Sequence, residues 1–103
     1  MNRRMEELIV AAGPEAEKML EAILVELLRV RVQYPDWPAD PVQAAEIVED
    51  KVRKNVQEAL DFYGYGGERS RMADACTQVG AMSLRFLTHL HVYHRRAKEA
   101  DHA

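Results

Sequence analysis

Residues 36–60, DWPADPVQAAEIVEDKVRKNVQEAL, decide the fold because they contain a helix start followed by a long amphipathic helix. Asp40 suits the N-cap, Pro41 suits the first helical position, and Gln43 stands where it completes a capping box. Apolar residues then recur at spacings of three and four, which predicts one apolar stripe along the helix. The stripe consists of Val42, Ala45, Val48, Val52, Val56, Ala59 and Tyr63.

The other side of this helix is densely charged. It carries Glu46, Glu49, Asp50, Lys51, Arg53, Lys54, Glu58 and Asp61. Glu49 with Arg53, Asp50 with Lys54, and Lys54 with Glu58 are spaced as i,i+4 ion pairs, which stabilise a surface helix without any ligand. The charged side is therefore either solvated surface or the wall of a charged site.

The flanking sequence predicts three further helices. Residues 3–12 form a short helix that ends at Gly13, and a second helix runs from Pro14 to about Tyr34, where Pro35 and Pro38 end it. The central helix ends near Tyr63, with Gly64 following it, and Ser70 is the expected N-cap of the last helix. No strand alternation or internal repeat is present. We expect an all-α fold of three long helices after a short first one, in a single domain over residues 1–103.

The last helix has an unusually broad apolar surface. One stripe consists of Met72, Cys76, Val79, Ser83, Phe86, Leu90 and Tyr93, and a second of Gly80, Leu84, Leu87 and His91. This pattern predicts a helix that is covered from two sides, with Cys76 as a small buried residue. A chain of 103 residues is too short to cover it alone. We therefore expect a homo-oligomer, either a dimer or a dimer of dimers.

Composition excludes several classes of partner. A net charge of −3 argues against a general nucleic-acid binder. One cysteine excludes an internal disulfide and fits a reducing cytosol. No stretch approaches the roughly 18 to 20 apolar residues of a membrane span. We expect a cytoplasmic, soluble protein that binds neither nucleic acid nor membrane.

Two further groups of residues have a structural and a functional interpretation. Trp37 is the only tryptophan; it either anchors the proline-containing connector to the core, which is favoured, or stacks on a base. His89, His91 and His94 form a loose HxHxxH pattern. Core or interface histidines are favoured there over a metal site, because no carboxylate or cysteine nearby completes a ligand set.

Three segments resemble MazG-like proteins, in particular the short phage-associated type. They are YPDWPADPVQAAEIV, VQEAL and ACTQVGAMSLRFL, and the resemblance extends over roughly residues 20–90. Members of this family are all-α nucleoside triphosphate pyrophosphohydrolases that use magnesium held by an ExxE pair on one helix and an ExxD pair on the next. Residues three apart share a helix face, so two facing helices gather four carboxylates around hard cations.

This chain lacks those carboxylates. Where the family typically reads EEAGEL, residues 50–55 read DKVRKN, so that the ExxE pair corresponds to Lys51 and Lys54. The ExxD pair corresponds to Ala75 and Gln78. Lysine beside a magnesium site opposes binding of the cation. The resemblance thus implies a family fold whose metal site has been dismantled.

The resulting functional hypothesis is a catalytically degenerate MazG-like protein that acts as a nucleotide-binding, polyanion-binding or interaction module. It has no catalytic residue and needs no cofactor, and Lys51, Lys54 and Trp37 are its nucleotide-binding candidates. The first alternative is an active magnesium-dependent pyrophosphohydrolase with relocated ligands at Glu46, Glu49, Asp50 and Asp74. The second is a helical protein-interaction module unrelated to nucleotides.

Overall fold

Four α-helices and one short 3-10 helix make up the computed structural model, which describes residues 2–94. They are α1 (Arg3–Ala12), α2 (Pro14–Gln33), α3 (Pro41–Gly64), α4 (Arg69–Thr88) and η1 (Leu90–Val92). The described part of the chain contains no strand, which confirms the prediction of an all-α fold with a short first helix and three long ones. None of the described helices combines the length and the hydropathy that a membrane crossing requires.

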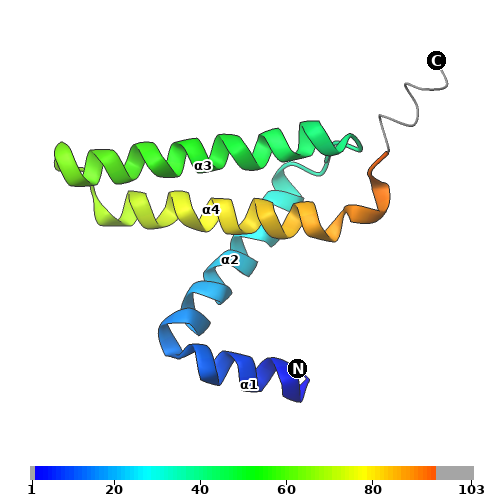
Figure 1. Ribbon diagram of the computed structural model, residues 1–103, viewed down its shortest axis with the longest axis horizontal. Coiled ribbons are helices and arrows are strands. Elements are labelled where there is room, and N and C mark those ends of the chain that lie inside the picture. Colours follow the sequence, from blue (N-terminus) through cyan, green and yellow to red (C-terminus); the bar gives the residue numbers. More distant parts are fainter. Residues whose placement is uncertain (1, 95–103) are drawn as a thin grey trace.

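A glycine sets the angle between the first two helices. Gly13 has a φ of 96°, a conformation that glycine adopts without steric cost. Its N–H donates to the carbonyls of Ile9 and Val10, and Pro14 then starts α2. The chain turns here, so that α1 packs against α2 and against no other described helix (Figure 1).

The ends of α3 and α4 show where the sequence predicted boundaries well and where it did not. Asp40 caps α3 as predicted, since its Oδ1 accepts the N–H of Val42 at 2.7 Å. Gly64 is the last residue of α3 instead of following it. The N-cap of α4 is Glu68, not Ser70. The N–H of Gly67 donates to the carbonyl of Asp61, so that the chain has already turned back before Ser70 is reached.

Two of the three long helices form a hairpin, and the third crosses it. α3 and α4 lie side by side and antiparallel, and α2 crosses α4 on one side of them (Figure 1). Gly80 allows the close crossing, because a Cβ at this position would lie 2.8 Å from Cδ1 of Ile23 in α2. The core lies at the crossing and consists of Leu27, Val30, Ala81 and Met82, with Trp37, Ile47, Val48 and Leu84 packed around it.

The predicted apolar stripe of α3 lies mostly outside this core. Val52, Val56 and Tyr63 are 42%, 52% and 92% exposed, whereas Ala44, which is not part of the stripe, is fully buried. Cys76 of α4, which was predicted to be buried, is exposed as well. The physical reason is that α2 packs against α4 and not against α3, so that much of the surface of the hairpin stays uncovered by the described helices.

The contact at Gly80 generates a stability prediction. We expect Gly80→Leu to lower the free energy of unfolding by about 1 to 3 kcal/mol, because the added side chain forces Ile23 out of its packed position. Gly64→Leu is the matched control, since a Cβ there meets no atom within 4 Å; we expect a change within about 0.5 kcal/mol. Urea denaturation followed by circular dichroism measures both. Equal effects of the two substitutions would show that the α2–α4 crossing is not tightly packed.

Candidate functional site

One cavity brings together residues from α2, the connector, α3 and α4. Its volume is about 480 Å³, which is in the range of small-molecule sites. Four cationic side chains and one carboxylate surround it, together with polar, aromatic and apolar residues. The lining residues are Arg29, Val30, Tyr34, Asp36, Trp37, Ile47, Lys51, Lys54, Gln78, Met82 and Arg85. We call this cavity the cationic pocket.

Both candidate lysines lie on the wall formed by α3. Lys51 and Lys54 are three residues apart and therefore project from one face of the helix, Lys51 partly buried and Lys54 exposed. The predicted pair of Glu49 with Arg53 forms at 3.0 Å. The pairs predicted for Lys54 with Asp50 and with Glu58 do not form, and Glu58 instead lies 3.7 Å from Arg71. Within residues 2–94 neither lysine has an ion-pair partner.

The most deeply buried charge of the described residues is Arg85, which is only 3% exposed. Its Nη2 donates to the carbonyl of Tyr34 at 2.7 Å and to that of Pro35 at 3.3 Å. Its Nε has no hydrogen-bond acceptor, and within residues 2–94 no carboxylate pairs with it. Burial lowers the pKa of Arg85, and the charge of Arg31 lowers it further, yet a guanidinium stays protonated in proteins. The pocket wall therefore contains a buried positive charge that no carboxylate of residues 2–94 pairs with.

Trp37 holds this arginine in place. The guanidinium carbon of Arg85 lies 4.9 Å from the centroid of the indole ring, a cation–π distance. The indole Nε1 donates to the hydroxyl of Tyr93 at 2.9 Å, and that hydroxyl donates to the carbonyl of Phe86. The ring of His89 lies 5.8 Å from the indole. Trp37 is thus packed against the core as an anchor of the connector, the interpretation that the sequence favoured.

Arg29 and Gln78 complete the charged and polar lining. Arg29 donates to both carboxylate oxygens of Glu26, the closer at 2.6 Å, and this hydrogen bonding raises its pKa. Gln78 has a buried Oε1 with no donor. Gln78 was one of the four positions that the resemblance aligned with a family carboxylate, and Ala75, another of them, is buried. Lys51, Lys54 and Gln78 line the cationic pocket, whereas Ala75 does not.

The sequence did not identify Arg29, Asp36 or Arg85 as site residues. The position of Arg85 carried a usable signal, since it is an arginine within the apolar segment AMSLRFL of a helix expected to be covered on two sides. A charge at such a position is retained only where it finds compensating groups. Arg29 carried no comparable signal, because a helix with many exposed charges can hold an arginine anywhere.

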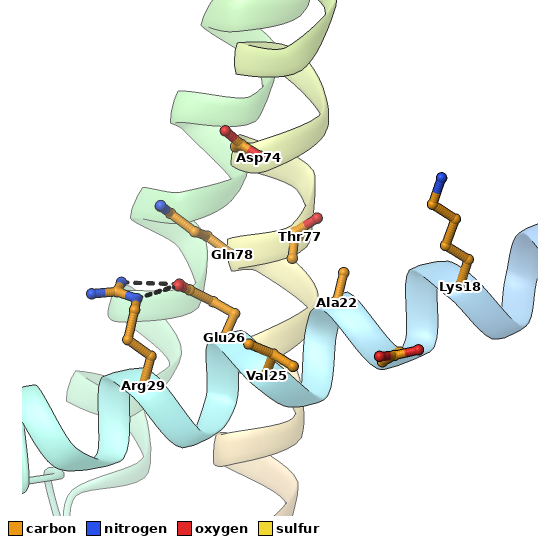
Figure 2. A pocket seen from close by; sticks show the side chains of 9 residues that line it. Lys18, Ala22, Val25, Glu26, Arg29, Asp74, Thr77 and Gln78 are labelled. Carbon is orange, nitrogen blue, oxygen red and sulfur yellow. Dashed lines mark hydrogen bonds and ion pairs between the residues drawn. The ribbon is translucent and has the colours of Figure 1, made fainter.

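A second cavity of about 740 Å³ adjoins the cationic pocket and lies between α2 and α4 (Figure 2). It shares Arg29 and Gln78 with that pocket and also contains Asp74, Thr77, Glu21, Glu26 and Lys18. Figure 2 shows Glu26 turned toward its partner Arg29, while Asp74 lies higher on α4. The cavity is an open groove with charges of both signs.

The relocated magnesium ligands are not brought together. Asp74 faces the groove beside α2, whereas Glu46, Glu49 and Asp50 line neither cavity and are exposed on α3. The HxHxxH residues form no metal site either: Nδ1 of His89 lies 2.8 Å from the carbonyl of Arg85. Across residues 2–94 no three His, Cys, Asp or Glu side chains are placed to hold a metal ion.

Comparison of the chain with models of protein families, with curated proteins and with solved structures finds no match.

The arrangement of the carboxylates predicts the outcome of an activity assay. We expect no magnesium-dependent or manganese-dependent release of pyrophosphate from any common NTP or dNTP, because the pocket presents cations where a metal site needs carboxylates. The measurement is pyrophosphate release by the purified protein with either metal. Steady turnover that Asp50→Ala or Glu49→Ala abolishes would instead establish the relocated metal site.

Proposed function

We propose that this chain binds a nucleotide, or a similar phosphate-bearing anion, in the cationic pocket without a metal ion. One observation carries the proposal: Arg29, Lys51, Lys54 and Arg85 converge on a single cavity whose lining contains one carboxylate, that of Asp36. The whole chain has a net charge of −3. A concentration of positive charge on an otherwise acidic protein favours an anionic ligand.

The three cations other than Arg29 have no carboxylate partner among the described residues. An anion that enters the pocket therefore displaces no ion pair when it contacts Lys51, Lys54 or Arg85. Arg85 contributes most per contact, because a charge in a low-dielectric wall interacts more strongly than one in water. Its backbone partners and Trp37 hold it in position before the ligand arrives.

The two lysines supply mobile ammonium donors at the opposite wall. Each can donate to phosphate oxygens, and together with Arg85 they take over the electrostatic part of a metal ion's role. None of these groups can activate a water molecule for attack on phosphorus, so the pocket binds without hydrolysis. The hydroxyl of Tyr34, the carboxylate of Asp36 and the amide of Gln78 are available for the sugar and the base.

The proposed fold family is MazG-like, with its metal site replaced by cations and the bundle completed by oligomerisation. The register that aligns Lys51, Lys54 and Gln78 with family carboxylates supports this, because these side chains reach one cavity from two helices. A shift of one residue would turn them to different faces. The phage-related and cytoplasmic assignments stay predictions from the sequence.

The lysine contribution is tested by calorimetry with ATP and dNTPs at low salt, with and without EDTA. We expect weak binding that survives EDTA, decreases as salt is added, and weakens about tenfold or more in Lys51→Ala/Lys54→Ala. Arg53→Ala/Arg71→Ala is the matched control. It too removes two positive charges, one from α3 and one from α4, but neither arginine lines the cationic pocket. Equal affinities of the two double variants would show that Lys51 and Lys54 are solvated surface residues that do not contact the ligand.

The role of Arg85 is tested by thermal unfolding in pyrophosphate. We expect the midpoint of the wild-type protein to rise by a few degrees at pyrophosphate concentrations well above Kd, in line with about 1 to 3 kcal/mol of linked stabilisation. Arg85→Met should abolish the rise, because methionine fills the space without a charge. Since the variant also loses the hydrogen bonds to the carbonyls of Tyr34 and Pro35, its circular dichroism spectrum is compared with that of the wild type to check that it is folded. A rise of the same size in Arg85→Met would exclude Arg85 from the site.

A further inference from the structure

Arg29 lies at the boundary between the two cavities of the molecule. Among the described residues it is the only cationic side chain that lines both the cationic pocket and the groove between α2 and α4. Glu26, one turn earlier on α2, lines the groove but not the pocket. The guanidinium of Arg29 can therefore serve either a carboxylate in the groove or an anion in the pocket.

In the structure Glu26 takes both sides of this guanidinium. The Nε of Arg29 donates to Oε1 of Glu26 at 2.6 Å and to Oε2 at 3.0 Å, and Nη2 donates to Oε2 at 2.9 Å (Figure 2). The remaining nitrogen, Nη1, donates to the side-chain oxygen of Gln33. A forked pair of this kind is also the geometry in which an arginine binds phosphate. Glu26 thus occupies the donors that a phosphate in the pocket would use.

This ion pair is more shielded than the other pairs within single helices. The side chain of Glu26 is 14% exposed, whereas those of Glu7 and Glu49, which pair with Arg3 and Arg53, are 61% and 60% exposed. A shielded carboxylate is screened less by water and salt, so the loss of its partner costs more free energy. An anion that takes Arg29 away from Glu26 has to offset this cost.

We propose that Glu26 competes with the ligand for Arg29 and thereby sets the anion affinity of the cationic pocket. The inference rests on the proposed function, because it requires that the pocket binds an anion. Lys51, Lys54 and Arg85 contact that anion without breaking an ion pair, whereas Arg29 contributes only when it leaves Glu26. Glu26 acts through Arg29 and is therefore a positioning residue that lowers the affinity.

The first test is calorimetry with pyrophosphate at low salt and without a metal ion. We expect Glu26→Gln to bind about three- to tenfold more tightly than the wild type, because glutamine keeps the shape of the side chain but no longer neutralises Arg29. The matched control is Glu21→Gln, which removes a carboxylate that lines the same groove but forms no ion pair with Arg29. It should change the affinity less than about twofold. Equal gains in the two variants would show a general effect of charge and overturn the proposal.

A double-mutant cycle with Arg29 separates competition from a structural effect of Glu26. Arg29→Gln should weaken pyrophosphate binding less than about twofold in the wild type but remove the whole gain in the Glu26→Gln background, since only there is Arg29 free for the ligand. The affinity of Glu26→Gln should also fall more steeply with added salt than that of the wild type, because one more cation contacts the ligand. An effect of Arg29→Gln that is the same in both backgrounds would contradict the competition.

The same measurements distinguish failure of this inference from failure of the proposed function. If pyrophosphate binds the wild type and Glu26→Gln with equal affinity, the anion site stands and the role of Glu26 is wrong. If pyrophosphate binds neither protein, both proposals are wrong. A strong loss of affinity from Arg29→Gln in the wild type would also overturn the inference, because Arg29 would then contact the ligand in spite of Glu26.

Discussion

The hydrogen bonds from Arg85 to the carbonyls of Tyr34 and Pro35 hold the connector between α2 and α3 against α4. A segment that contains prolines cannot satisfy its carbonyls by continuing a helix, so the compensation has to come from elsewhere in the fold. Trp37 adds a stack on the guanidinium and a hydrogen bond to Tyr93. Where α3 starts relative to α4, and so where Lys51 and Lys54 point, depends on this contact.

The same contact creates the chemistry of the pocket. An arginine that bonds only to neutral carbonyls keeps its full charge, and its Nε remains without an acceptor. A carboxylate partner would stabilise the arginine and remove its attraction for a ligand. The structural anchor and the proposed anion-binding group are thus one residue, and the fold tolerates the buried charge because backbone dipoles and an aromatic face surround it.

The hairpin divides the molecule into two chemically different sides. On one side α2 crosses at Gly80, and the cationic pocket lies between the crossing helix, the connector and the hairpin. On the other side the residues are apolar and uncharged, with a shallow groove. A single pair of helices thereby presents a pocket lined by four cationic side chains on one side and an uncharged groove on the other.

The sequence alone determined the all-α architecture, the Asp40 cap, the break at Gly13 and the proline-bounded connector, because these depend on local backbone chemistry. It also identified Lys51 and Lys54 as a pair on one face. Only the tertiary structure decided which of the two sides of α3 packs inward. Helical periodicity shows that a stripe is apolar but not what covers it. For this reason Cys76 was predicted to be buried, although the structure leaves it exposed together with Val52 and Val56 of the α3 stripe. The sequence also could not predict that Arg85 and Lys51 line the same pocket. Residues far apart in sequence meet only once the helices have packed, and no spacing rule connects them.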